Sequence, residues 1–287
     1  ILSSVFKLIM PLVKGRQTTI SFKDLNGHLY VVIVSMDQLL MAVKDVLLVE
    51  EYEMLTPFNS CYRHRLVVDA GAHVGLYSLK MMEKAEKIIA LEPEPRNYKL
   101  LLENIYRNHA YAKIIPLRVA LWKKRGLVKL FKGSDTSMHS LFGTGEMLKV
   151  PAIEFSQIID RYGDIDLLKM DIEGAEYQVL LSMKDNELLR VKKIVAELHP
   201  LRDYKVAITK IIVKLKRLGF NVSVVKPPIS QPLSYTVHRI TGSRLVNPRW
   251  LKPLAVFFYA IGKLMKARSS VMMLYALRLD HNERTTS

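Results

Sequence analysis

The chain has 287 residues, of which 49% are hydrophobic, and its 43 lysines and arginines exceed its 27 aspartates and glutamates to give a net charge of +16. This length suits one large domain or one domain with an appendage, and the single cysteine, Cys61, excludes an intramolecular disulfide. No uninterrupted apolar stretch reaches the roughly 18–20 residues of a membrane-spanning helix, and the N-terminus has no signal-peptide cleavage pattern, so we expect a cytoplasmic protein.

Residues 1–58 are predicted to form an extension of the main domain. Within it, residues 18–35 are expected to form a β-hairpin whose turn is Asn26-Gly27. A helix is predicted over residues 36–48, and the stretch "EEYEMLTPFNS" then leads into the main domain. We therefore expect the main domain to span residues 59–287.

From residue 65 onward, apolar strands alternate with helices, which predicts a parallel sheet covered on both faces. Ligands of such sheets bind beyond the carboxyl ends of the strands, so the chemistry should lie in the residues that end each strand. The predicted strands are 65–71, 87–93, 113–121, 126–132, 164–171, 191–200 and 220–225, and the predicted helices are 76–85, 97–108, 153–163, 174–183 and 204–219.

The first of these strands ends in "VVDAGAHVGLYS". Asp69, Gly71 and Gly75 form the pattern D-x-G-x-x-x-G, in which Gly71 permits a tight turn close to a ligand and Gly75 permits close helix packing. His73 stands where a dinucleotide-binding turn has its middle glycine, which disfavours a pyrophosphate. A smaller cationic nucleoside such as S-adenosylmethionine fits better, with Asp69 near its positive charge.

An acidic residue follows the second strand, where nucleotide-binding α/β folds hold a ribose. Glu92 comes seventeen residues after Gly75, and a carboxylate at this place can accept both ribose hydroxyls. The alternative is that Glu92 binds no ligand and is a solvated residue at the end of the strand. The glycine turn and the spaced acid together indicate a nucleoside more specifically than either does alone.

Acidic residues also gather where the fourth strand passes into its helix, in "LLKMDIEGAEYQVL". Asp171 ends the strand, and Glu173 and Glu176 lie in the first helical turn, where the helix dipole favours carboxylates by about 0.3–1 kcal/mol each. The helix dipole explains why Glu176 occurs at this position. It does not explain why Asp171 and Glu173 occur beside Gly174, and we assign these two residues to the edge of a ligand site.

The fifth strand ends in "AELHP", which places Glu197 and His199 on the same side of the strand. An imidazole with an unperturbed pKa of about 6.5 suits proton transfer near neutral pH. The alternative is a structural histidine that precedes a proline.

Four segments in this order and spacing resemble the FkbM family of S-adenosylmethionine-dependent methyltransferases over about residues 50–200. The most specific is the block Lys-x-Asp-x-Glu-Gly-Ala-Glu at 169–176. The others are "VVDAGAHVGLYSL", "ALEPEPRNYKLLLENI" and "VALWKKRG". The resemblance implies a class I methyltransferase fold, which is a Rossmann-like α/β fold with a seven-stranded, mostly parallel sheet and a reversed last strand. It also implies O-methylation of a hydroxyl on a glycan, a lipid or a small molecule.

The site follows from the resemblance and from the strand ends together. His73 replaces the asparagine that the family usually has, so its backbone is expected to serve in place of its side chain. The predicted cofactor-binding residues are Asp69, Gly71, Ala72, His73, Gly75, Glu92, Pro93, Ala120 and Asp171, and the predicted catalytic residues are Asp171, Glu173 and His199.

Two interpretations of the catalytic residues stay open. In the first, Asp171 or His199 is the base that deprotonates the acceptor hydroxyl, and Glu173 or Glu197 orients that base or the acceptor. Alternatively, Asp171 and Glu173 ligate a divalent metal that acidifies the hydroxyl. We predict no metal site.

The positive charge is concentrated near the C-terminus, because residues 201–287 carry 16 basic and 3 acidic side chains. Residues 249–268 have bulky apolar residues at helical spacing and lysines on another face, so this helix is predicted to lie on an anionic membrane surface, at the inner face. The alternative is a helix packed over the sheet or over the substrate crevice. It would be an insertion at about 245–269, before a last strand at 271–279.

Two other functions compete with methylation of a glycan, lipid or small molecule. An RNA methyltransferase fits the charge, although the sequence has no Asn-Pro-Pro-Tyr-like block and no recognisable RNA module. A non-catalytic, membrane-associated binding protein of the same fold is the third.

Overall fold

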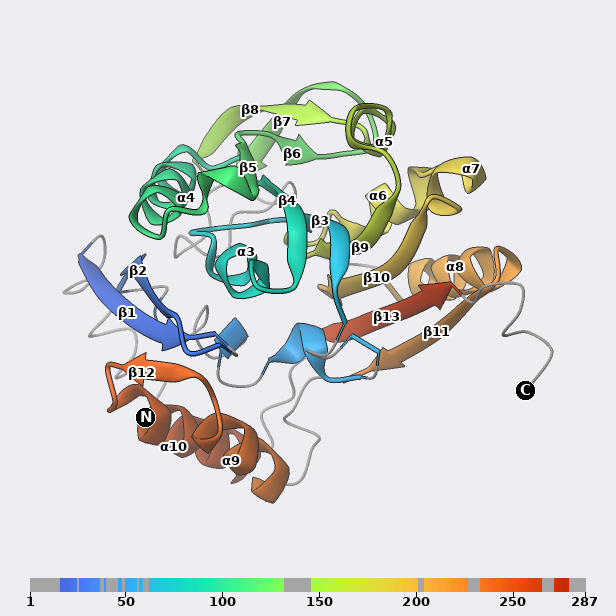
Figure 1. The fold of residues 1–287 in the computed structure, drawn as a ribbon. Coiled ribbons are helices and arrows are strands. Elements are labelled where there is room, and N and C mark those ends of the chain that lie inside the picture. Colours follow the sequence, from blue (N-terminus) through green and yellow to red (C-terminus); the bar gives the residue numbers. More distant parts are fainter. Residues whose placement is uncertain are drawn as a thin grey trace.

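The central feature of the fold is a mixed sheet at the middle of the molecule (Figure 1). The computed structural model describes residues 16–24, 26–36, 39, 46–47, 50–55, 57–58, 62–131, 146–200, 204–226, 233–264 and 271–278. Most of the helix predicted over 36–48 lies outside these residues.

Within this part of the chain, seven strands form the central sheet in the order β11-β13-β10-β9-β3-β4-β5. All pairs are parallel except those of β13, which runs antiparallel to β10 and β11. This order confirms the predicted sheet with its reversed last strand, the class I methyltransferase fold. The strands are β3 (His64–Ala70), β4 (Ala85–Leu91), β5 (Ile114–Leu117), β9 (Ile165–Met170), β10 (Val191–Leu198), β11 (Phe220–Val225) and β13 (Met272–Arg278).

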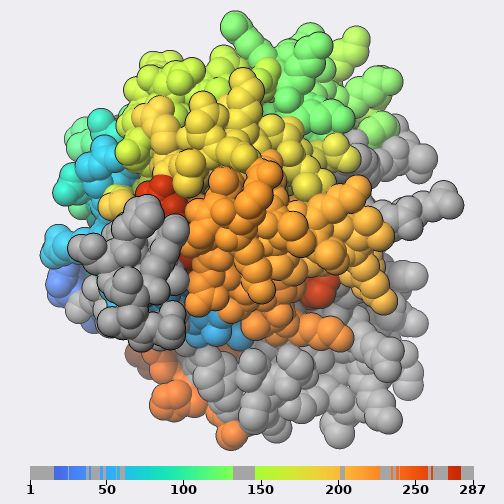
Figure 2. Space-filling view, turned by 90° about the vertical axis from the view of Figure 1, so that its right-hand side faces the viewer, coloured from blue at the N-terminus to red at the C-terminus, as the bar shows by residue number. Residues whose placement is uncertain are grey.

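Helices cover both faces of the sheet, as predicted. Because side chains alternate along a strand, Val67 packs on one face, whereas Leu66 and Val68 pack on the other. Figure 2 shows α8 and β11, in orange, covering one side of the molecule, with β13 visible only in small red patches. The helices are α3 (Leu76–Met81), α4 (Pro95–Arg107), α5 (Phe155–Tyr162), α6 (Glu176–Ser182), α7 (Asp185–Leu188), α8 (Tyr204–Arg217), α9 (Leu233–Thr241) and α10 (Leu251–Leu264), and the short 3-10 helices are η2 (Glu51–Glu53) and η3 (Ala110–Ala112).

One predicted strand, 113–121, is wrong as a single element. The chain turns after β5, where the Val119 N–H donates to the carbonyl of Leu117, and then continues as β6 (Ala120–Leu121). Strand β6 pairs with β8 (Met147–Ile153), which in turn pairs with β7 (Gly126–Phe131), so these strands form a separate small sheet. The sequence interpretation included β7 but missed β8.

The predicted N-terminal hairpin is confirmed as β1 (Gln17–Lys23) paired with β2 (Leu29–Ser35). Its other edge pairs with β12 (Leu245–Asn247), which belongs to the C-terminal insertion. Two parts of the chain that are far apart in sequence therefore form one sheet, beside α9 and α10 in Figure 1.

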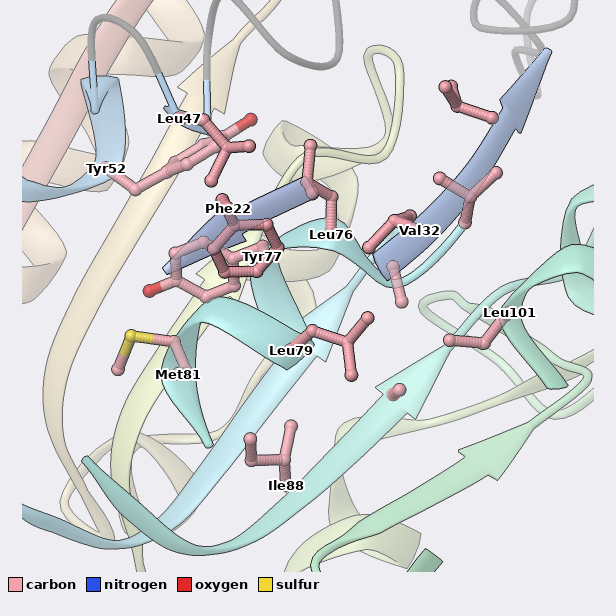
Figure 3. Close-up of a cluster of buried hydrophobic side chains, with 14 of the residues drawn as sticks. Phe22, Val32, Leu47, Tyr52, Leu76, Tyr77, Leu79, Met81, Ile88 and Leu101 are labelled. Carbon is pink, nitrogen blue, oxygen red and sulfur yellow. The ribbon is translucent and has the colours of Figure 1, made fainter. Parts of the chain in front are cut away.

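The hairpin shares its core with the central sheet. Phe22 and Val32 pack in the same apolar cluster as Ile88 of β4 (Figure 3). The buried amide of Asn104 on α4 accepts from the N–H of Ile33 at 2.8 Å and donates to the carbonyl of Ile33 at 2.9 Å. The predicted division between an extension (1–58) and a main domain (59–287) stays a prediction. The described residues of the hairpin and of the main domain pack together in one core.

The described part of α10 has one buried and one exposed face. Leu251 and Ala255 are buried in the core, whereas Trp250, just before the helix, and Phe257 are 51% and 53% exposed. In the residues that the structure describes, no helix is long and apolar enough to cross a membrane. Contact with an anionic membrane stays a prediction.

We expect weak binding of the protein to vesicles that contain anionic lipid, with affinity falling as salt is added, because the C-terminal charge is screened. Replacing both exposed aromatics, as Trp250→Ser with Phe257→Ser, should weaken binding in a sedimentation assay. Tyr106→Ser on α4, which removes an aromatic ring that is 76% exposed, is the control. Equal binding to neutral and anionic vesicles would contradict the electrostatic contribution.

Candidate active site

The carboxyl ends of β9, β3 and β4 meet at one edge of the sheet, as predicted from the parallel arrangement. The Asp171 N–H donates to the carbonyl of Ala70 at 3.0 Å, and the Gly71 N–H donates to the carbonyl of Leu91 at 3.0 Å. The strand ends that bear the predicted site residues are therefore hydrogen-bonded to one another.

The glycine turn is shaped by close backbone packing. Gly71 has a φ of +80°, and a Cβ atom there would lie 1.8 Å from the carbonyl oxygen of Asp171. Gly75 has a φ of +87°, and its Cβ would lie 2.6 Å from a methyl group of Leu101. The backbone contact at Gly71 leaves no room for a side chain, and both glycines have a positive φ that other residues rarely adopt. His73 also has a positive φ, of 54°, within this turn.

Asp69 lies beneath the turn and is completely buried. Its carboxylate accepts a hydrogen bond of 2.6 Å from the Ser78 hydroxyl and is 3.1 Å from the ammonium nitrogen of Lys169. Lys169 also donates to the carbonyl of Gly71 at 3.0 Å. Asp69 therefore supports the turn through Lys169, a residue that the sequence interpretation quoted but gave no role, and its contact with a cofactor stays a prediction.

Glu92 is held at the end of β4 by backbone amides. One carboxylate oxygen accepts from the His73 N–H at 2.8 Å, and the other accepts from the Glu94 N–H at 2.9 Å. Burial raises the pKa of Glu92 to about 7, although these two N–H donors oppose the rise. Each oxygen can accept a second hydrogen bond, so Glu92 fits the predicted ribose contact.

The remaining predicted cofactor residues lie in two places. The Ala72 N–H donates to the carbonyl of Leu91, and Pro93 follows Glu92 at the same edge. Ala120 is instead in the small sheet, where it pairs with Ala152. Together, the glycine turn and Glu92 supply the backbone approach and the acceptor that an adenosyl ligand needs, and their contacts with it stay predictions.

His199 lies among acidic side chains from the end of β9 and the start of α6. Its Nδ1 is 3.2 Å from Glu176, and its Nε2 is 3.4 Å from Glu173 and 3.9 Å from Asp171. Burial alone lowers the pKa of His199, but the hydrogen bond and charge of Glu176, together with Asp171 and Glu197, raise it to about 11. At neutral pH the ring is therefore protonated, and it neutralises carboxylates and does not accept a proton.

Glu176 does more than interact with a helix dipole. Its fully buried carboxylate accepts from the N–H of Ile172 at 2.8 Å and from the N–H of Gly174 at 2.9 Å. Glu173 between them has a φ of +53°, a conformation that this folded-back side chain stabilises. Burial and the neighbouring charge of Asp171 raise the pKa of Glu173 to about 8, so this group is mostly neutral at pH 7.

Tyr52 also enters the cluster, and the sequence interpretation missed it. Its hydroxyl lies 2.8 Å from Asp171 and 3.0 Å from Glu197. Tyr52 comes from η2, far from both residues in sequence, and no motif surrounds it. Nothing in the sequence pairs this tyrosine with those carboxylates.

Asp171, Glu173 and His199 each offer a ligand atom within 4.8 Å of the others, a spacing that a metal ion could bridge. A protonated imidazole, however, has no lone pair for a metal, so binding would require loss of a ring proton. The imidazolium supplies positive charge among these carboxylates, and the predicted absence of a metal stays a prediction.

Comparison with known proteins relates this chain to methyltransferases. The family model "Methyltransferase FkbM domain" matches residues 69–222. The methyltransferase sdnD of Sordaria araneosa is 29% identical over 169 residues, which cover 46% of this chain and 65% of that protein. The 31-O-demethyl-FK506 methyltransferase FkbM of Streptomyces tacrolimicus is 24% identical over 214 residues, which cover 62% of this chain and 80% of that protein. The solved structure of methyltransferase FkbM from Methylobacillus flagellatus is 17% identical, with a TM-score of 0.42, and the alignment covers 61% of this chain and 45% of that one.

The raised pKa of Glu92 predicts a pH-dependent affinity for S-adenosylmethionine. An ionised carboxylate accepts two ribose hydroxyls better than its protonated form, so affinity should rise between pH 6 and pH 8. Calorimetric titration of the protein with S-adenosylmethionine at each pH measures this affinity. Glu92→Gln should weaken binding about 10- to 100-fold and flatten the pH dependence. Glu103→Gln, on the exposed face of α4, is the control, and an unchanged dissociation constant for Glu92→Gln would remove Glu92 from the binding site.

Proposed function

Because the chain belongs to the FkbM methyltransferase family, whose methyl donor is S-adenosylmethionine, we propose that it methylates a hydroxyl oxygen of a glycan, a lipid or a small molecule. The observation that supports oxygen as the acceptor is the acidic cluster beside the glycine turn, because an alcohol needs a base and a carboxylate can act as one. The name of the Streptomyces relative also specifies methylation of an oxygen.

The donor supplies an electrophilic methyl group on a positively charged sulfur. The chain's part is to align the acceptor oxygen with that methyl group, and orientation of this kind can contribute roughly 7–11 kcal/mol. Glu92 and the turn at Gly71 hold the donor from the β3 and β4 ends. The strand end at Asp171 is hydrogen-bonded to the same turn, so donor and base have a fixed separation.

Asp171 is the base in this proposal. Its side chain is 27% exposed, so an acceptor hydroxyl can reach it, and a proton taken from the acceptor can leave to solvent. We do not assign the base to His199, because the carboxylates around it raise its pKa to about 11. We assign His199 to reducing the repulsion between Asp171 and the carboxylates around it.

The acceptor class is tested by incubating the protein with methyl-labelled S-adenosylmethionine and a cell extract, and then separating lipid, glycan, small-molecule and RNA fractions. We expect label in one of the first three, in a base-stable ether. Label in RNA would support an RNA methyltransferase instead. Cofactor binding without any labelled product would support a binding protein of the same fold.

The same assay tests the base. Asp171→Asn should lower kcat about 10²- to 10⁴-fold, because the amide cannot accept the acceptor proton. Calorimetry with the donor shows whether binding is retained. Asp185→Asn, which breaks an exposed ion pair with Arg217, is the control and should retain full activity. Full activity in both Asp171→Asn and His199→Ala would remove the cluster from the chemistry.

Removal of metal should leave turnover unchanged, because His199 supplies the positive charge among the carboxylates. Dialysis against a chelator, followed by assay with and without added Mg²⁺ or Mn²⁺, measures this. Loss of activity that the added ion restores would assign a metal to Asp171, Glu173 and His199.

A further inference from the structure

The outer edge of β2 is hydrogen-bonded by two side chains of the α4 segment in place of another strand. Asn104 accepts from the Ile33 N–H at 2.8 Å and donates to the Ile33 carbonyl at 2.9 Å. Asn108, which directly follows α4, accepts from the Val31 N–H at 2.9 Å and donates to the Val31 carbonyl at 2.8 Å. Each amide therefore satisfies both backbone groups of one residue at the edge of the hairpin.

The spacing of the two asparagines matches the spacing of the strand. Four residues along an α-helix advance about 6 Å. Two residues along a β-strand, whose backbone groups point to the same side, advance about 6.6 Å. The two side chains can therefore pair with alternate residues of β2 at the same time, and α4 takes the place of the next strand.

The two amides differ in their third hydrogen bond. The other N–H of Asn104 donates to the carbonyl of Val74 at 2.9 Å, inside the glycine turn. The other N–H of Asn108 donates to the backbone carbonyl of Asn104 at 2.8 Å, within the helical turn that precedes it. The fully buried side chain of Asn104 therefore joins the glycine turn to the hairpin, which lies outside the residues 69–222 that match the family.

Val74 lies in the middle of the predicted donor-binding turn. The preceding residue, His73, donates its N–H to Glu92 at 2.8 Å. The following residue, Gly75, has a φ of +87° and packs against Leu101 of α4. A shift of the Val74 carbonyl would therefore move the N–H that orients the predicted ribose acceptor.

The orientation of the Asn104 amide is fixed by its partners. Its nitrogen contacts two carbonyl oxygens, which can only accept, and its oxygen contacts an N–H, which can only donate. Removing the amide would leave three backbone groups without this partner, and the turn would then shift to satisfy its carbonyl elsewhere.

We propose that Asn104 is a positioning residue for S-adenosylmethionine, because it holds the Val74 carbonyl and thereby the N–H of His73 that orients Glu92. Ile33 holds the Asn104 amide in turn, so the N-terminal hairpin supports donor binding through α4. The inference rests on the proposed function, because that function places the donor at the glycine turn.

Asn104→Ala tests the proposal, and Asn108→Ala is the matched control. Both substitutions remove the pairing of an asparagine with β2, but only Asn104→Ala also removes a hydrogen bond to the glycine turn. We expect Asn104→Ala to raise the Kd for S-adenosylmethionine about 10-fold in a calorimetric titration. Asn108→Ala should leave the Kd within about twofold of the wild-type value.

The titration has to separate a displaced turn from loss of folded protein. Circular dichroism defines conditions in which each variant is more than about 90% folded, where residual unfolding raises the apparent Kd by only about a tenth. A Kd for Asn104→Ala within about twofold of the wild-type value under these conditions would overturn the proposal. Equal weakening in both variants would also overturn it, because the bond to Val74 would then have no effect of its own.

Turnover gives a second readout for the same variants. Asn104→Ala should raise the KM for the donor about 10-fold and change kcat at saturating donor little, because the base lies on a different strand end. A merely structural defect would lower kcat through loss of active enzyme and leave the KM unchanged. That pattern would overturn the positioning role.

A measurement on the wild type covers the case in which Asn104→Ala does not fold. Coupling between two sites is reciprocal, so bound S-adenosylmethionine should hold the Ile33 N–H more firmly. Amide hydrogen exchange, followed by NMR, should slow more at Ile33 than at Val31 when the donor is added. Equal slowing at the two amides would overturn the proposal. Absence of labelled product from the wild type would instead contradict the proposed function and leave the binding and exchange results standing.

Discussion

The ammonium group of Lys169 is the charge on which the site depends. Removing such a group from water costs several kcal/mol unless its partners compensate, and here they are the carboxylate of Asp69, the carbonyl of Gly71 and the faces of two aromatic rings. These partners come from β3, from the glycine turn, from α3 and from η2. Satisfying one buried cation therefore fixes the positions of the turn, the strand end and the N-terminal segment at once.

Next to this cation, carboxylates from two strand ends and one helix start converge. Their negative charges repel one another. His199 supplies positive charge among them. Burial and the charge of Asp171 raise the pKa of Glu173, and the charges of Glu176, Asp171 and Glu197 raise the pKa of His199 against the effect of burial. The carboxylate of Glu176 accepts hydrogen bonds from backbone amides of its own turn. Asp171 is the most exposed carboxylate that contacts the imidazole, which is why chemistry is assigned to it.

The sequence predicted the sheet well, because strands buried on both faces are continuous apolar runs with turn residues between them. It also predicted that Glu92, Asp171 and His199 lie at the ends of strands. It failed where structure depends on partners distant in sequence. Strand β12 and the pairing of β8 have weak local patterns, Tyr52 has no motif, and the role of Glu176 depends on a folded-back rotamer. The buried state of Asp69 was missed because its partner, Lys169, lies in a different strand.

The position of β13 has a consequence for biosynthesis. Strand β13 lies between β10 and β11, although residues 272–278 follow both of them in the chain. Until the ribosome has released these residues, β10 and β11 each have an unpaired border where β13 will bind. A nascent chain stalled before residue 272 would therefore contain most of the sheet but lack the strand that joins β10 to β11 near one edge, a state that favours pairing with strands of other chains.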